Sequence, residues 1–346
     1  MKVHKFALLC ISLIFNLASL QQLIGISPSY IVLFLKRNIK FYEIIFISLL
    51  CFAFYYQALT ENSIIINYLQ LVFDLLLAYL IVDIVKNSDP IKVKSIINFS
   101  ANCLLFLALI STLDYYYFGN IVNSILTKIT LWGNSGEFIP RLSLTFSNPN
   151  WGSFTIFFFL VLSYIFKSSQ SLKVKLFFLI IFLQSKSAIL ISILFVAINS
   201  PMQLYKKITF LVFFISMILI TLPNLISIEE TASYFNRLIM FQEVIDQTEL
   251  YPQGLMGDND IRQLITKTGE DTLPSLLTLI YGFGWLFFMM LFSLFLLNAM
   301  KSKISFSIFI SLVLFSLVYS FLTVGIVSAI GIAMIILALN KKDFNY

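Results

Sequence analysis

The chain has 346 residues, of which 59% are hydrophobic and 12% charged, and its formal net charge is +6. A soluble protein of this length carries about a quarter charged residues, so the composition excludes an ordinary soluble domain. Several apolar runs are long enough to cross about 30 Å of hydrocarbon as a helix. We therefore predict an all-α, polytopic integral membrane protein built as a helical bundle.

The basic residues do not form a face that would bind nucleic acid. They lie singly or in short groups between the apolar runs, which is how membrane orientation signals are arranged. Cys10, Cys51 and Cys103 all lie inside apolar runs, and an odd number of buried thiols indicates packing residues rather than disulfides or metal ligands. We expect no nucleic-acid partner, no metal and no cofactor.

The first apolar run begins behind a short basic start. Residues 1–5 followed by 6–20 resemble a signal peptide, but no small-x-small cleavage site follows, and we predict a retained first helix. Gly25 to Pro28 interrupt this run before it resumes over 30–35. Because 6–36 is long for one crossing and short for two, we predict a tight hairpin of two short helices.

The later runs are mostly of a length that crosses the membrane once. We predict spans at 41–59, 64–85, 95–116, 151–166, 208–226, 273–297, 304–321 and 324–339. Segment 176–198 differs, because Gln184, Ser185, Lys186 and Ser187 interrupt its centre. We predict two short helices there that enter and return, which makes about 10–12 transmembrane segments in a single domain over 1–346.

The lysines predict the orientation of the chain. With both termini cytoplasmic and segment 176–198 returning to its own side, most of the 23 lysines and arginines are cytoplasmic. If that segment crossed once, the later lysines would face outward against this rule: Lys206, Lys207, Lys301, Lys303, Lys341 and Lys342. The favoured topology is a multi-pass protein with two larger outer-face loops, 117–150 and 228–271.

The first outer loop contains a cation beside a polar turn. Arg141 presents a rigid fork of donors that pairs two phosphate oxygens and stays charged. Its plain alternative is a solvated arginine that touches lipid headgroups. Asn148, Pro149 and Asn150 follow, and Asn150 could cap a helix beginning at Trp151, a role compatible with substrate binding.

The second outer loop combines an amphipathic helix with acidic residues. Ser227 to Glu230 form a capping-box pattern, and the apolar residues after it recur with helical spacing. We predict a helix on the membrane surface, with Arg237 near its polar boundary. The cluster Asp258, Asp260, Glu270 and Asp271 matches no calcium loop, and a solvated loop is its plain alternative.

Two ionisable residues interrupt apolar segments. Lysine at the bilayer centre costs about 2.5–3.5 kcal/mol on insertion scales. Lys186 therefore either lies in the outer membrane interface, at the tip of the 176–198 hairpin, or faces the same cavity as the arginines of the two outer loops. Asp74 lies within 64–85 and is either a functional carboxylate or a helix–helix hydrogen-bond partner.

Four short motifs occur in a fixed order between residues 141 and 297. They are Arg141 with Asn148-Pro149-Asn150 and Gly152, the Ser185-Lys186-Ser187-Ala188 break, Arg237 through Pro252-Gln253-Gly254, and Asp271 with 276–281 and Gly282. Together with the topology they resemble the bacterial O-antigen and capsular polysaccharide polymerase family, and more distantly its sister O-antigen ligases. The sequence departs from the family pattern in two places. Lys186 stands where the family has an arginine, and the residue spacing in the second loop does not repeat that in the first.

The resemblance implies a glycosyltransferase of the bacterial inner membrane. It would join oligosaccharide repeats linked to a polyprenyl diphosphate, such as undecaprenyl diphosphate, on the outer face. Arg141 and Arg237 would stabilise the departing pyrophosphate, and Asp271 or Asp258 would activate the acceptor hydroxyl. Further substrate contacts are expected from Asn148, Asn150, Lys186 and Arg262. Membrane lipid and a chain-length regulator protein would be partners.

Two other functions compete with polymerisation. Ligases of this superfamily usually carry a histidine in the second loop, but the only histidine here is His4. A flippase or transporter of the lipid-linked unit would predict internal repeats and a charged pathway through the membrane. The sequence shows no repeat, and its only mid-membrane charges are Asp74 and Lys186. These differences favour the polymerase over the ligase and the flippase.

Overall fold

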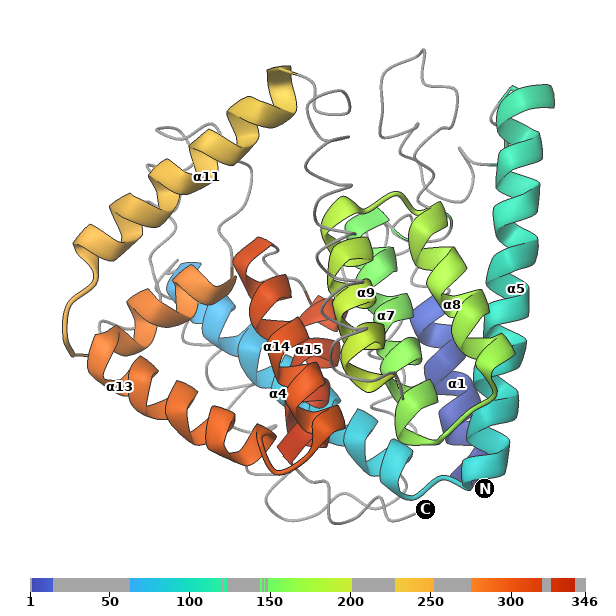
Figure 1. Ribbon diagram of the computed structural model, residues 1–346, viewed down its shortest axis with the longest axis horizontal. Helices are drawn as coiled ribbons and strands as arrows, with labels where there is room; N and C mark the ends of the chain where they lie inside the picture. Colours follow the sequence, from blue (N-terminus) through green and yellow to red (C-terminus); the bar gives the residue numbers. More distant parts are fainter. Residues whose placement is uncertain are drawn as a thin grey trace. The chain divides into compact units, whose positions relative to one another are not determined.

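The structure is a computed structural model that describes residues 2–14, 63–119, 121–122, 144, 146, 149–200, 228–251, 275–318 and 325–339. Within these ranges every regular element is a helix and none is a strand (Figure 1). The helices are α1 (Lys2–Ile14), α4 (Ser63–Lys86), α5 (Pro90–Tyr117), α7 (Pro149–Ile165), α8 (Gln170–Phe182), α9 (Lys186–Asn199), α11 (Ile228–Gln247), α13 (Ser275–Ala299), α14 (Lys303–Val318) and α15 (Gly325–Leu339).

The all-helical prediction is confirmed over the described residues. Two of the helices are long and apolar enough to cross a membrane, Pro90–Tyr117 and Leu276–Ala299. Helices also form at the predicted spans 64–85, 151–166, 304–321 and 324–339, with ends that differ by a few residues. The predicted spans 41–59 and 208–226, and most of the hairpin 6–36, lie outside the described residues.

Helix starts follow local capping chemistry. The Asp89 side chain accepts a hydrogen bond of 3.0 Å from the Ile91 N–H, and Pro90 occupies the first turn of α5, where its missing N–H is not needed. Ser169 caps α8 by accepting from the Leu172 N–H at 3.4 Å. These caps fix the two turns at the lysine-rich end of α5 and α8.

The chain divides into two compact units. Unit 1 comprises Met1–Ile44, Phe73–Ser192 and Val324–Tyr346, and unit 2 comprises Ile45–Val72 and Ile193–Thr323.

Helix α7 is the core of unit 1. It packs against α8, α5 and α15, and α5 packs in turn against α1 and α8. Phe154, Phe157, Phe158 and Phe159 are all fully buried, so α7 is enclosed on every side. A helix that is apolar all round is expected at such a central position.

Polar contacts join the helices of unit 1 near the lysine-rich end. The Lys175 ammonium on α8 donates to the side-chain oxygens of Asn98 at 3.1 Å and Asn102 at 2.9 Å, both on α5. The Lys173 ammonium lies 4.2 Å from the centre of the Tyr164 ring on α7, within cation–π range. α8 is thus tied to both of its neighbours.

Unit 2 is built around α13, which packs against α14 and α11. Within α13, Gly284 has φ 65° and ψ 166°, so the helix is broken there rather than continuous. The predicted span at 273–297 coincides with α13, but the prediction named no break at Gly284. The break is stabilised by tertiary contacts that the apolar sequence alone does not reveal, because the Trp285 and Leu286 N–H groups donate to the Glu249 and Leu250 carbonyls, both at 3.1 Å.

Candidate functional site

Unit 1 brings two of the predicted motifs together around Gly152. A β-carbon at Gly152 would lie 2.5 Å from Phe146 Cδ2 and 3.1 Å from Leu183 Cδ1. Phe146 belongs to the first outer loop, Gly152 lies in the first turn of α7, and Leu183 follows α8. The Asn-Pro-Asn-Trp-Gly motif and the Ser-Lys-Ser-Ala motif therefore lie at the same end of unit 1, which we call the Gly152 end.

The predicted break inside 176–198 is confirmed. α8 ends at Phe182 and α9 begins at Lys186. Gln184 adopts φ 52° and donates its N–H to the Ile181 carbonyl at 2.9 Å, which closes the turn. The Ser185 carbonyl accepts the Ile189 N–H at 2.9 Å, as the carbonyl of an N-cap residue does. The chain reverses direction at this turn (Figure 1).

Both helices of this pair are short. α8 has 13 residues and α9 has 14, so at 1.5 Å per residue each is about 20 Å long. That is less than the roughly 30 Å of a bilayer core. A pair of such helices suits the entry and return that the lysine distribution predicts.

Two of the predicted substrate-binding residues lie at the Gly152 end. Lys186 is the first residue of α9 and is exposed, whereas Asn150 is the second residue of α7 and is half-buried. The first turns of both helices present backbone N–H groups that lack partners within their own helix, and helix N-termini favour anions. With the Lys186 ammonium, this end of unit 1 has the chemical character of a phosphate-binding surface.

The predicted capping role of Asn150 was wrong. α7 begins at Pro149, so Asn150 is inside the helix rather than before it. The structure uses Pro149 as an early helix residue, a position that tolerates its missing N–H. The residue before the helix is Asn148, which lies outside the described residues.

The structure describes the other predicted site residues only in part. Arg141, Asp258, Arg262 and Asp271 lie outside the described residues, as does the side chain of Arg237. Their roles stay predictions.

A helix does form at the position predicted in the second loop, α11. Met240 and Val244 are fully buried against Leu277 of α13, with Phe241 and Tyr281 packed around them. The rest of the helix surface exposes Gln242 and Asp246, but it also exposes three large apolar residues, Leu238, Ile239 and Ile245. The apolar residues that pack are therefore Met240 and Val244, and the predicted amphipathic pattern is not what holds α11 against α13. Arg237 lies one turn before Met240 in α11, which fixes the position of its backbone within unit 2.

Comparisons with protein-family models, with curated proteins and with solved structures found no match to this chain.

The structure also adds a carboxylate that the sequence interpretation did not single out. Asp114 lies in the last turn of α5 and is 1% exposed, and Asp74 in α4 is fully buried. The available signal was the position of Asp114 within the apolar run 95–116, close to its boundary with the first polar segment. Among the described residues, no group of three His, Cys, Asp or Glu side chains is placed to hold a metal ion.

Proposed function

We propose that this chain is a polysaccharide polymerase of the bacterial inner membrane, with both termini cytoplasmic. It would join polyprenyl-diphosphate-linked oligosaccharide repeats on the outer face. The acceptor hydroxyl oxygen bonds to the anomeric carbon of the growing chain while the bond from that carbon to the diphosphate breaks. The lipid diphosphate leaves with the bonding electrons, and the hydroxyl proton passes to a base.

The observation that best supports this proposal is the convergence at the Gly152 end. Phe146 and Leu183 meet at Gly152, although the two motifs around them are separated by most of α7 and α8. Both motifs belong to the resemblance with the polymerase family, and their meeting is what a shared diphosphate site would require. Lys186 and two helix N-termini lie at that end.

Departure of the diphosphate is the step that most needs help from the protein. Arg141 and Arg237 would neutralise the charge that develops on the bridging oxygen, with support from Lys186 or Arg262. Such cations can act without a metal because they are fixed before the reaction begins. Removing one well-placed donor at a site of this kind costs about 3–4 kcal/mol of barrier.

The acceptor needs a base or an orienting carboxylate. Asp271 is the first candidate and Asp258 the second. Both belong to the part of the second outer loop that lies between α11 and α13 in sequence. Asn148 and Asn150 would contribute hydrogen bonds to the substrate.

The test compares surface polysaccharide in cells that carry single substitutions. Arg141→Ala and Arg237→Ala should leave glycan of one repeat on gels, because flipping and ligation continue while polymerisation fails. Lys128→Ala, which removes an outer-loop cation outside the motifs, should leave the ladder of chain lengths unchanged. A normal ladder of chain lengths in both arginine variants would show that Arg141 and Arg237 do not have the role in polymerisation that we assign to them.

The same gels separate the alternatives. A flippase defect would abolish surface glycan altogether, because no repeat would reach the outer face. A ligase defect would leave long chains on the lipid carrier and none on the final acceptor. The broken α8–α9 pair makes the flippase comparison necessary, because discontinuous helices also occur at transporter sites.

A further inference from the structure

The two sides of α5 differ in the size of their residues. The buried side includes four small residues, Ser100, Ala101, Ala108 and Ser111. The exposed side has large residues instead, and these include Phe99, Phe106, Leu109, Leu113 and Tyr116. Small residues let membrane helices approach one another closely, whereas large apolar side chains that face water are unfavourable. The exposed side of α5 therefore fits contact with lipid better than contact with water.

The exposed residues of α5 form one continuous row along the helix. From one end to the other they recur every three or four residues, as Phe99, Asn102, Phe106, Leu109, Leu113 and Tyr116. This spacing keeps them on one face of the helix, and we call these six residues the α5 stripe. At 1.5 Å per residue the stripe is about 26 Å long, close to the roughly 30 Å of a bilayer core.

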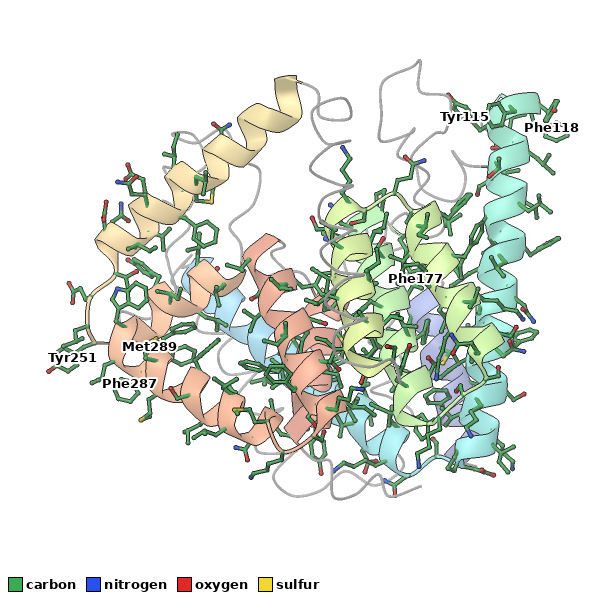
Figure 2. All side chains as sticks on the ribbon, viewed as in Figure 1. Tyr115, Phe118, Phe177, Tyr251, Phe287 and Met289 are labelled. Atoms are coloured by element: carbon green, nitrogen blue, oxygen red, sulfur yellow. The ribbon has the colours of Figure 1, made fainter. Side chains whose placement is uncertain are left out.

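The two ends of α5 differ in chemistry. The last turn and the residue after it are aromatic, and Figure 2 shows Tyr115 and Phe118 at this end of the helix. The rings of Tyr115 and Tyr116 lie edge to face with their centres 5.0 Å apart. Tyrosine is enriched where a bilayer meets water. The other end has Lys92 and Lys94 in its first turns, so the stripe runs from a cationic end to an aromatic end.

A fixed cation lies beside the stripe toward its cationic end. The Lys175 ammonium of α8 donates to the side-chain oxygens of Asn98 at 3.1 Å and Asn102 at 2.9 Å. An ammonium has three N–H donors, so these two bonds leave one. Because both amide oxygens face the ammonium, both amide NH₂ groups point away from it. These three residues, the Lys175 cluster, therefore suit an anion with several acceptor oxygens.

Neither α5 nor α8 has a carboxylate close enough to neutralise the Lys175 cluster. α8 has no acidic residue, and the nearest ones along α5 are Asp89 at its cap and Asp114 in its last turn. At 1.5 Å per residue, Asp89 is about 13 Å from Asn98 along the helix, and Asp114 is about 18 Å from Asn102. Charges separated by more than about 8–10 Å in solvent are largely screened at physiological salt. The matching negative charge therefore lies outside α5 and α8.

We propose that the α5 stripe and the Lys175 cluster bind an acidic phospholipid. Its phosphate accepts hydrogen bonds from Lys175 and Asn102, and its acyl chains cover Phe99 and Phe106. A second copy of α5 fits this face less well, because helices in membranes meet mainly through small residues. On the topology proposed above, the lipid belongs to the cytoplasmic leaflet. The proposal rests on the proposed membrane location but not on the polymerase activity.

The test measures which phospholipid the folded protein retains. The full-length protein is reconstituted in vesicles of phosphatidylcholine and phosphatidylglycerol in equal amounts, extracted in mild detergent, and analysed with its bound lipid by native mass spectrometry. The wild type should retain phosphatidylglycerol in preference. Lys175→Met should lower the ratio of phosphatidylglycerol to phosphatidylcholine about fivefold, the contribution of one lysine to anionic lipid binding. Only folded protein with bound lipid is counted, so a loss of stability does not change this ratio.

Three further variants separate the cluster from charge alone. Lys175→Arg keeps the charge and should keep the preference. Asn102→Leu keeps the ammonium but removes one amide, and should lower the ratio about two- to fivefold, the effect of about one hydrogen bond. The matched control is Lys301→Met, which removes an exposed lysine that bonds to Asn298 at 2.6 Å within a single segment. It should leave the ratio unchanged.

Three results of the lipid measurement would overturn the site. One is equal retention of the two phospholipids by the wild type. Another is an equal fall of the ratio in Lys175→Met and Lys301→Met, which would show a general attraction to a basic protein. The third is displacement of the phosphatidylglycerol by inorganic phosphate, which would show a site for a soluble anion.

Cross-linking tests whether a second copy covers the stripe instead. Single cysteines at Phe106 and at Leu294, which is exposed on α13, are compared in native membranes after the three native cysteines are replaced by serine. Equal, low yields of disulfide-linked dimer support the lipid. A higher yield from Phe106→Cys would overturn it in favour of a dimer.

Two further measurements separate this site from the proposed function. Arg141→Ala and Arg237→Ala should keep the preference for phosphatidylglycerol, and normal polysaccharide ladders in these variants would overturn the polymerase alone. Release of the wild-type protein from membranes by alkaline carbonate would overturn the membrane location, and with it both proposals.

Discussion

At the scale of single residues, Gly152 has no room for a side chain, because Phe146 and Leu183 occupy the space that a β-carbon would need. Gly152→Ala should therefore separate the first polar segment from the α8–α9 turn. We expect a loss of about 1–3 kcal/mol in stability, as for other overpacked sites, together with shorter polysaccharide. Thermal unfolding in detergent and gels of surface glycan would measure the two effects.

The neighbouring Ser153 provides the control for this substitution. It is fully buried, and its hydroxyl has no hydrogen-bond partner among the described residues. Ser153→Ala removes a buried polar atom without adding volume, so it should be neutral or slightly stabilising. If Gly152→Ala behaved like Ser153→Ala in both measurements, close packing at Gly152 would not be what brings the two motifs together.

At the scale of elements, the two helix breaks show what a sequence can and cannot predict. The α8–α9 break was predictable because Lys186 and its polar neighbours interrupt an apolar run, and a charge is costly within a membrane. The Gly284 break was missed because glycine in an apolar run is compatible with a continuous helix. Only contact with 249–251, more than thirty residues earlier in the chain, shows that it is broken.

The candidate site shows the same limit. Capping chemistry predicted a helix start beside Pro149 but assigned the cap to Asn150, which is the second residue of α7. The proximity of Gly152 to Leu183 depends on how α7 packs against α8. The spacing of the motifs along the chain does not reveal how the helices pack. Only the order of the motifs indicated a common site.

We expect Lys175 to make the polar contact that contributes most to the packing of α8 against α5. It donates to Asn98 and Asn102 at one end of unit 1, and hydrogen bonds from a charged donor are stronger than neutral ones. Lys175→Met should lower stability by about 1–2 kcal/mol, measured by thermal unfolding in detergent. Lys92→Met removes an exposed lysine from the first turn of α5 and should change stability little; equal effects of the two would argue against the tie.

At the scale of the whole molecule, the α8–α9 pair determines the side on which everything after it lies. If the α8–α9 pair returns to the cytoplasmic side, residues 170 and 300 are cytoplasmic and residue 246 lies on the outer face. If 176–198 crosses once, 246 becomes cytoplasmic and 300 is outside. The positive-inside rule favours the first arrangement, because the second would place Lys301 and Lys303 on the outer face.

Cysteine labelling distinguishes these two topologies. Single cysteines at Gln170, Asp246 and Met300, all exposed positions, would be introduced after Cys10, Cys51 and Cys103 are replaced by serine. An impermeant maleimide added to intact cells should label Asp246→Cys alone, and permeabilised cells should label all three. Labelling of Met300→Cys but not Asp246→Cys in intact cells would show that 176–198 crosses once. The second loop would then face the cytoplasm, away from lipid-linked repeats on the outer face, and its assigned role in polymerisation would fail.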